Sequence, residues 1–332
     1  MSTKEMILAV LESSDGFVSG ETLSQQCGIS RTAIWKQIQK LQQEGYQIES
    51  QHRTGYRLVG MNDVFNAQEI RRQLPGEFWQ NGEILYYDEL DSTNQEARRL
   101  SSQGYGQGTV IVADAQTAGR GRLGRHWDSS GGKGIWFSLI LEPKVSLQQT
   151  SYYSFVAAIA VAEGIRQETG LRAEIKWPND ILIGGKKVCG ILLELMAELT
   201  QVHQLIMGIG INANQTLADF PEDVQAKATS LAIESGHPVQ RSQVLGAILQ
   251  HLKENCRLLE EEGFSIIREK WTALSCVVGK EVRIIQQGKE LMTGIAEGLG
   301  EDGALLVRTD QGIEHIIAGD VSLRAMDGGY AF

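Results

Sequence analysis

The residues with the clearest chemical potential lie in one short stretch, G-R-G-R-L-G-R-H-W at residues 119–127, which holds three glycines and three arginines. Glycines keep a backbone flexible, and arginines carry positive charge that must be neutralised before a segment can pack. We therefore expect a loop that is disordered alone and becomes ordered around an anionic ligand, with Trp127 closing over an apolar part of that ligand. An exposed basic turn is the simpler alternative, and the Gly-Arg repeat argues against it.

The same stretch formally matches G-x-G-x-x-G, the fingerprint of dinucleotide-binding folds. That fingerprint requires a strand before it and a helix opening at it. The segment GTVIVAD predicts the strand, but His126 and Trp127 lead into SSGGKGIWFSLIL, which predicts a second strand instead of a helix. No Gly-Lys-Ser/Thr follows, so the sequence also argues against a phosphate-binding P-loop.

Two further segments place polar side chains where predicted strands end. K-W-P-N-D brings Lys176, Asn179 and Asp180 to a turn. Asp180 is a candidate Mg²⁺ ligand, because Mg²⁺ binds one or two carboxylates together with phosphate oxygens. A plain Pro-Asn-Asp turn explains the same residues equally well. G-I-G-I-N ends another strand with glycines that let a ligand approach the backbone next to Asn212.

A lysine pair and a helix start complete the candidate groups. G-G-K-K-V-C-G puts Lys186 and Lys187 on opposite sides of a predicted strand, so that one of them can enter a pocket. A solvated lysine pair is the alternative. D-S-T-N at residues 91–94 is an N-cap signal for the helix that follows, and its hydroxyls and amide can also meet a polar ligand at the helix start.

Residues 1–62 are expected to form a separate unit. Apolar residues recur at helical spacing near the start, Ser19 and Ser30 are candidate N-caps of two further helices, and Gly28 breaks the chain between them. The segment YQIESQHRTGYRLV then alternates apolar and polar residues around a Thr-Gly turn and predicts a two-stranded hairpin. Three helices followed by a hairpin are typical of a winged helix-turn-helix.

This unit offers donors that suit DNA phosphates and base edges, on the polar face of the helix after Ser30 and on the hairpin. They are Ser30, Arg31, Thr32, Trp35, Lys36, Gln39, His52, Arg53 and Arg57. A small helical interaction domain is the alternative. The first 60 residues carry six basic and six acidic residues, so the clustering of the basic ones alone supports DNA binding.

The rest of the chain divides into two parts. Residues 63–272 alternate strand and helix patterns and predict an α+β domain with a mixed central sheet. Residues 273–332 contain short alternating strands separated by glycine-rich turns and predict a small β-barrel. The expected fold is therefore an α+β multidomain chain with boundaries after residues 62 and 272.

The composition of the 332-residue chain is that of a globular protein, with 42% hydrophobic and 22% charged residues. Because the net charge is -10, any nucleic-acid contact must come from a local patch. Four widely spaced cysteines argue against a zinc site and a disulfide framework. The longest apolar run is too short and interrupted to span a bilayer. We expect a cytoplasmic protein without a membrane partner.

Five motifs follow the predicted winged helix in order: D-S-T-N, Q-x-x-G-R-G-R-x-G-R-x-W, K-W-P-N-D, K-x-x-G-I-L and G-x-G-I-N. This constellation resembles the bifunctional biotin protein ligases that also repress the biotin operon. The resemblance covers essentially the whole chain, and it implies a class II synthetase-like central domain and an SH3-like C-terminal barrel. It also implies two reactions. Biotin and ATP form biotinyl-5′-adenylate and pyrophosphate, and biotin then passes to a lysine of the biotin carboxyl carrier protein of acetyl-CoA carboxylase.

The resemblance implies a role for each motif residue. Arg122 and Lys187 are the catalytic candidates, because positive charge must offset the repulsion between the biotin carboxylate and the α-phosphate. The implied biotin contacts are Ser92, Thr93, Asn94, Gln116, Arg120, Gly121, Arg122 and Lys187. The implied ATP and adenylate contacts are Arg120, Arg122, Trp127, Lys176, Asn179, Asn212 and Arg324, with Asp180 as the Mg²⁺ ligand.

Two features depart from the family pattern. Leu123 stands where family members often carry another basic residue, and residues 215–227, expected to fold over adenosine, cannot be matched residue by residue. The resemblance further implies that the adenylate-bound chain forms a homodimer and binds operator DNA with two half-sites.

Three other functions stay open at this stage. A lipoate ligase of the same superfamily would lack the Gly-Arg-Gly-Arg loop. A biotin-sensing repressor without catalysis has no need of both Arg122 and Lys187. A ligase whose winged helix no longer represses is compatible with the neutral charge of the first 60 residues.

Overall fold

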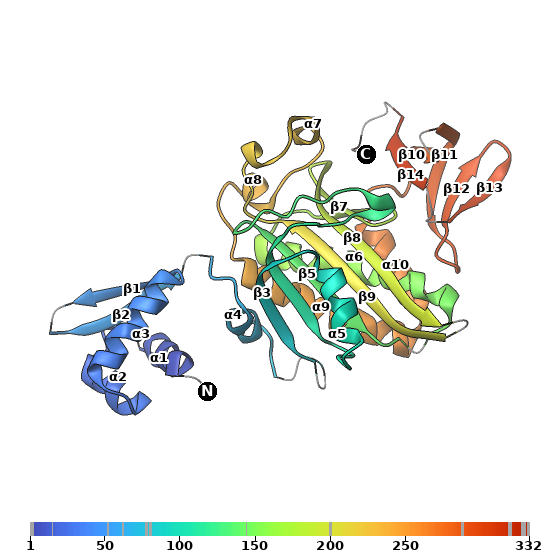
Figure 1. The fold of residues 1–332 in the computed structure, drawn as a ribbon. Coiled ribbons are helices and arrows are strands. Elements are labelled where there is room, and N and C mark those ends of the chain that lie inside the picture. Colours follow the sequence, from blue (N-terminus) through green and yellow to red (C-terminus); the bar gives the residue numbers. More distant parts are fainter. Residues whose placement is uncertain are drawn as a thin grey trace. The chain divides into compact units, whose positions relative to one another are not determined.

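The computed structural model describes residues 3–14, 16–51, 53–61, 63–76, 79, 82–143, 145–198, 201–286, 289–317, 321–326 and 330. The chain divides into two compact units, Met1–Val64 and Phe65–Phe332 (Figure 1). Within the described ranges, no helix is both long enough and apolar enough to cross a membrane.

The first unit contains three helices followed by a hairpin. They are α1 (Thr3–Glu12), α2 (Gly20–Cys27), α3 (Arg31–Gln43), β1 (Tyr46–Gln51) and β2 (Gly55–Met61), and the two strands pair antiparallel. The Ser19 hydroxyl caps α2, and Gly28 ends it at a φ of 65°, a left-handed conformation that glycine adopts without a steric penalty. Ser30 caps α3 by accepting the Ala33 amide hydrogen. The predicted three helices and hairpin are confirmed.

One face of α3 forms the core of this unit. Ile34, Ile38 and Leu41 are fully buried and belong to one cluster with Leu8 of α1 and Leu23 of α2. Their spacing puts all three on one side of the helix, so its other side is left to solvent. That exposed side carries the predicted DNA-binding residues of α3, whereas Arg53 lies between the two strands of the hairpin.

The second unit is built on a seven-stranded mixed sheet, in which β3 and β4 pair in parallel and the remaining neighbours pair antiparallel. The strands, in their order across the sheet, are β3 (Ile84–Leu90), β4 (Val110–Gln116), β5 (Gly134–Leu141), β9 (Gln201–Asn212), β8 (Lys186–Glu198), β7 (Asp180–Ile183) and β6 (Glu174–Lys176). This arrangement confirms the predicted mixed sheet. The loop between β4 and β5 contains only the 3-10 turn Arg122–Gly124, so the argument against a dinucleotide-binding fold is also confirmed.

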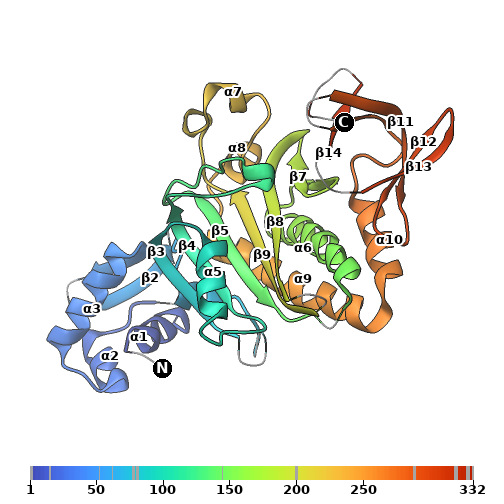
Figure 2. The same cartoon turned by 45° about the vertical axis from the view of Figure 1, so that its right-hand side comes forward.

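Helices cover both faces of this sheet. Figures 1 and 2 show α6 (Tyr152–Thr169), α9 (Arg241–Glu262) and α10 (Phe264–Leu274) on one face, and α5 (Thr93–Ser101) on the other. Alternate residues of β4 serve the two faces, because Val110 and Val112 join the cluster of α6 and α9 whereas Ile111 joins that of α5. The shorter elements are α4 (Ala67–Arg72), η2 (Leu147–Ser151), η3 (Leu217–Asp219), α7 (Glu222–Gln225) and α8 (Leu231–Ser235).

The chain then forms a second, five-stranded antiparallel sheet. Its strands, in order across the sheet, are β13 (Gly312–Ile316), β12 (Leu305–Thr309), β11 (Lys289–Leu299), β10 (Glu281–Gln286) and β14 (Val321–Ala325). Val282 and Ile284 of this sheet belong to the same buried cluster as the central sheet and its helices. The predicted C-terminal β domain is thus present as a sheet. Its closure into an SH3-like barrel, the class II synthetase-like character of the central domain and the domain boundaries stay predictions.

Candidate active site

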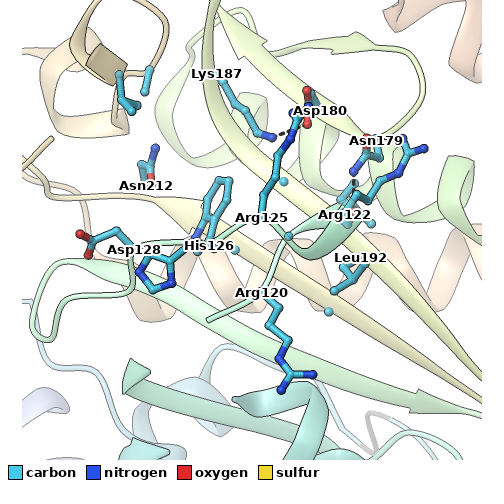
Figure 3. Close-up of a pocket in the computed structure, with 18 of the residues that line it drawn as sticks. Arg120, Arg122, Arg125, His126, Asp128, Asn179, Asp180, Lys187, Leu192 and Asn212 are labelled. Atoms are coloured by element: carbon cyan, nitrogen blue, oxygen red, sulfur yellow. Dashed lines mark hydrogen bonds and ion pairs between the residues drawn. The ribbon is translucent and has the colours of Figure 1, made fainter. Parts of the chain in front are cut away.

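The predicted binding and catalytic residues of the second unit meet at one cavity of about 480 Å³. It lies where β4, β6 and β9 end and β7 and β8 begin (Figure 3). Every one of these residues lines it: Ser92, Thr93, Asn94, Gln116, Arg120, Gly121, Arg122, Trp127, Lys176, Asn179, Asp180, Lys187, Asn212 and Arg324. These residues come from five separate motifs and, for Arg324, from the C-terminal sheet, so it is the fold that brings them together.

The start of α5 provides a buried polar floor. The side-chain oxygen of Gln116, the last residue of β4, accepts hydrogen bonds from the Thr93 backbone N–H at 2.8 Å and from the Thr93 hydroxyl at 3.3 Å. Asn94 donates to Glu194 at 2.8 Å. Ser92, Thr93 and Asn94 are each at most 6% exposed. Polar groups buried beside a cavity suit a ligand with its own donors and acceptors.

The N-cap predicted from D-S-T-N falls at Ser92, but without the side-chain hydrogen bond of a typical cap. The Asp91 carboxylate accepts the Ser92 backbone N–H at 2.7 Å and so stabilises the start of the helix in another way. The Ser92 hydroxyl is therefore not committed to the helix.

The glycine-arginine loop folds back on itself as a short hairpin. Gly121 donates its backbone N–H to the Arg125 carbonyl at 2.8 Å, and Trp127 donates to the Gly119 carbonyl at 3.0 Å. Leu123 lies at its tip with a φ of 58° and is 59% exposed. A left-handed conformation is costly for a leucine, by about 1–2 kcal/mol.

The arginines of the loop point in different directions. The Arg122 guanidinium donates to the Asn179 side-chain oxygen at 2.9 Å. In Figure 3 the side chains of Arg122 and Arg125 extend toward Asn179 and Asp180, whereas Arg120 extends the opposite way. Arg125 also lines the cavity and was not among the predicted site residues, although it belongs to the same repeat.

Trp127 lies against a glycine surface. Gly190 of β8 and Gly210 of β9 are paired across the two strands, and a Cβ atom on them would approach the indole to 3.0 Å and 2.7 Å respectively. Trp136 contacts the same indole edge-on, with 6.4 Å between ring centroids, and the Lys187 ammonium lies 5.1 Å from its ring centroid. The glycines are therefore needed for the indole to reach this position.

A compact charged cluster occupies the other end of the cavity. The Lys187 ammonium lies 2.5 Å from the Asp180 carboxylate, and the Tyr330 hydroxyl donates to the other oxygen of that carboxylate. Burial opposes ionisation of Asp180, but Lys187 and Tyr330 outweigh it and keep the pKa of this carboxyl below its ordinary value. Burial, together with Asp180, raises the pKa of the Tyr330 phenol well above its usual range.

Lys176 is the buried cation of this cluster. It is 2% exposed, donates to the Tyr330 carbonyl at 2.9 Å, and lies 3.2 Å from the centroid of the Tyr330 ring. Burial lowers the pKa of Lys176 to about 7, and Arg324 and Lys187 act in the same direction while Asp180 opposes them. An anion entering here would restore the charged form.

Residues 214–229 form the remaining wall; residues 215–227 were expected to fold over adenosine, but no motif named individual residues there. Gln215, Phe220 and Val224 line the cavity, and Lys133 pairs with Asp219 to hold the segment. The backbone of Lys187 bonds to this wall: its N–H donates to the Lys227 carbonyl at 2.8 Å, and its carbonyl accepts the Thr229 N–H at 2.9 Å. The Asn212 side chain donates to the Thr229 carbonyl at 3.0 Å.

The residues predicted to contact DNA lie in the first unit. Arg31, Thr32, Trp35, Lys36 and Arg53 are exposed, Gln39 is half-buried, and Ser30 caps α3. Trp35 is 52% exposed. Arg57 pairs with Glu49 at 2.8 Å, and His52 lies outside the described residues.

Comparison with known proteins identifies three matching regions. Residues 86–212 match the Biotin/lipoate A/B protein ligase family, residues 3–57 match an HTH domain, and residues 277–324 match the Biotin protein ligase C terminal domain.

Full-length relatives and a solved structure agree with these matches. The chain is 40% identical to the bifunctional ligase/repressor BirA of Bacillus subtilis over 320 residues, which is 96% of this chain and 98% of the relative. It is 30% identical to BirA of Escherichia coli over 326 residues, covering 98% and 99% of the two chains. The biotin protein ligase of Aquifex aeolicus, solved with biotin and ATP, is 36% identical at a TM-score of 0.65 and covers 74% of this chain and all of its own. The chain therefore belongs to the biotin/lipoate protein ligase family and, within it, to the bifunctional ligase/repressors.

Proposed function

We infer that the chain is a biotin protein ligase that also acts as a biotin-responsive repressor. The observation that carries this inference is the meeting of the Ser92–Asn94 floor, the glycine-arginine loop and Lys187 at one cavity, in a chain 40% identical to a ligase/repressor over nearly its full length. The match to the Biotin protein ligase C terminal domain favours biotin over lipoate as the substrate.

Charge neutralisation is the main task of the site in forming biotinyl-5′-adenylate. The biotin carboxylate attacks the α-phosphate of ATP, so two anions must approach each other. Arg122 and Lys187 supply fixed positive charge at the place where they meet, and Arg120 and Gly121 complete the contact with the carboxylate and the phosphate. The floor from Ser92 to Asn94, together with Gln116, binds the ureido ring through hydrogen bonds. Trp127 covers the apolar part of the adenylate.

The charged cluster at the other end of the cavity suits the phosphates of ATP. Lys176 and Arg324 lie next to Tyr330 in this cluster, and Asn179 and Asn212 line the same cavity. Among the described residues no group of three or more metal-binding side chains gathers, and Asp180 offers a single carboxylate. One carboxylate fits Mg²⁺, which completes its coordination with phosphate oxygens and water. Bound there, Mg²⁺ would neutralise phosphate charge. Asp180 would first have to exchange Lys187 and Tyr330 for the ion.

The repressor function requires both units of the chain. The adenylate orders the loop, the ordered loop favours a homodimer, and the dimer places two helix-turn-helix units on the two half-sites of an operator. By linkage, a ligand that favours the dimer also raises operator affinity. We further propose a cytoplasmic location, which the widely spaced cysteines support.

Two assays test these functions. Incubation with biotin, ATP, Mg²⁺ and a biotin carboxyl carrier domain should increase the mass of that domain by one biotinyl group. Lipoate in place of biotin should give no product, and a lipoyl product would favour the lipoate alternative. A gel shift with operator DNA should require biotin and ATP. Equal binding without them would contradict the corepressor role.

A further inference from the structure

The side-chain amide of Gln116 serves two parts of the site at once. Its oxygen accepts hydrogen bonds from Thr93 on the floor, and its nitrogen donates to the Ser129 hydroxyl at 2.8 Å. An amide is planar, so its oxygen and nitrogen cannot be reoriented independently. Whatever fixes the oxygen side of Gln116 therefore also fixes the nitrogen side.

Behind the floor, the hydrogen bonds continue to a charged pair. The fully buried Ser138 hydroxyl lies 2.7 Å from the Thr93 hydroxyl and 2.6 Å from the Asn94 side-chain oxygen. Asn94 donates in turn to Glu194, whose other oxygen pairs with Arg98 at 3.1 Å. Because Glu194 can only accept while ionised, it fixes the Asn94 amide with its oxygen toward Ser138. The floor is thus held from behind.

At its other end, this chain of hydrogen bonds reaches the base of the loop. Ser129 is 3% exposed, and its hydroxyl donates to the Trp127 carbonyl at 3.2 Å. The Gln116 backbone N–H donates to the Ser129 carbonyl at 3.0 Å. Gly119 faces the same point, where a Cβ atom would lie 2.4 Å from the Trp127 carbonyl and 2.6 Å from the Ser129 hydroxyl. The Ser129 hydroxyl therefore sits where the two ends of the loop close.

We propose that Ser129 is a positioning residue that transmits ligand binding at the floor to the glycine-arginine loop through Gln116. The proposal rests on the proposed function, in which biotin binds the floor. A ligand that hydrogen-bonds to Thr93 or to the Gln116 oxygen fixes the amide plane, holds its nitrogen toward Ser129, and so stabilises the closed base of the loop. Ser129 itself does not line the cavity, so it acts through its neighbours and not on the substrate.

Limited trypsin digestion of the full chain reads the loop directly, since trypsin cleaves after Arg120, Arg122 and Arg125. Saturating biotin should slow cleavage there in the wild type. In Ser129→Ala the protection should fall roughly three- to tenfold, the range expected for one lost hydrogen bond. Thr117→Val is the matched control, because the Thr117 hydroxyl is exposed, bonds only weakly to the Leu90 carbonyl at 3.4 Å and does not line the cavity.

A double-mutant cycle separates transmission from a local structural effect. Ser129→Ala and Ser138→Ala remove hydroxyls on opposite sides of Gln116, and Glu194→Gln replaces Ser138→Ala if that variant does not fold. If both act through Gln116, the two losses in biotin affinity should be less than multiplicative. Ser129→Thr, which keeps a hydroxyl, should recover biotin protection. Multiplicative losses, or equal protection in Ser129→Ala and the wild type, would overturn the proposal.

The trypsin assay distinguishes a wrong role for Ser129 from a wrong function of the chain. If the wild type is protected by biotin and Ser129→Ala is protected equally, only the transmission role is wrong. If biotin does not protect the wild type and no adenylate forms, the proposed function is wrong and the transmission role falls with it.

Discussion

The Lys187 ammonium lies 2.5 Å from the Asp180 carboxylate at the wall of the cavity, and both side chains are largely buried. The proposed reaction asks each of them to bind something else, Lys187 the carboxylate and phosphate, and Asp180 a magnesium ion. The pair therefore keeps two reactive charges neutralised until the substrates replace it. Substitutions that remove both charges of the pair should therefore restore stability without restoring activity.

Removing Lys187 should damage both properties. Lys187→Ala leaves Asp180 buried without its cation, which should lower the free energy of unfolding by about 3 kcal/mol. Adenylate formation should fall by about two to three orders of magnitude, the usual effect of losing one group that stabilises transition-state charge. Chemical denaturation and pyrophosphate release measure the two effects. In the double variant with Asp180→Asn, stability should largely return and activity should not. A double variant as unstable as Lys187→Ala would show that the pair does not stabilise the fold.

ATP affinity should decrease as pH rises through 7. The pKa of Lys176 is lowered to about 7, so this side chain is mostly charged at pH 6 and mostly neutral at pH 8. If the charged form holds the phosphates, the KM for ATP should rise up to about tenfold between these values, following the protonated fraction. Lys176→Arg stays charged throughout. Its profile should show only the titration of ATP itself, and identical profiles for wild type and variant would rule out Lys176 as the titrating group.

The glycine surface under Trp127 should limit adenylate retention. In Gly210→Ala the new methyl group would lie 2.7 Å from the indole nitrogen, so Trp127 must move. We expect adenylate to dissociate about tenfold faster, with a changed tryptophan emission spectrum. Gly16→Ala, where a Cβ atom meets nothing within 4 Å, is the control. If Gly210→Ala released adenylate at the wild-type rate, Trp127 would not be the residue that retains the adenylate.

Operator binding should depend on the exposed side of α3. Lys36→Ala should weaken binding and reduce the slope of log affinity against log salt by about 1, as expected for one lost phosphate contact. Trp35→Ala should weaken binding without lowering the melting temperature, because the indole is 52% exposed. Lys253→Ala on α9 is exposed and distant in sequence, and it should change neither quantity. An unchanged salt slope for Lys36→Ala would contradict a phosphate contact by Lys36 on α3.

The sequence predicted the residues with distinctive chemistry and missed those that support them. Arginines between glycines, or a lysine in K-x-x-G-I-L, stand out because few structural roles need them. Ser129, Ser138 and Glu194 carry no such signal, since a serine in a strand has the same sequence context whether it holds a ligand contact or not. Their roles depend on which strands are neighbours. For residues 215–227 a role over adenosine was expected, but the individual residues of this wall could not be named for the same reason.

Local signals located helix starts but did not always predict the capping bond. D-S-T-N correctly indicated the N-cap of α5, which falls at Ser92, but the Ser92 side chain makes no capping bond. In the first unit, where Ser19 and Ser30 accept the expected amide hydrogens, the same rule succeeded. The short helices of the first unit could be predicted from local patterns. The cavity of the second unit could not, because it depends on contacts between distant segments.

We propose that the glycine-arginine loop at residues 119–127 becomes rigid when it closes over biotinyl-5′-adenylate. Hydrogen exchange of these amides, measured without ligand, with biotin, and with biotin, ATP and Mg²⁺ together, tests it most directly. The account predicts fast exchange in the free chain, slower exchange with biotin, and the slowest exchange once the adenylate has formed. Exchange at the same rate in all three states would contradict it.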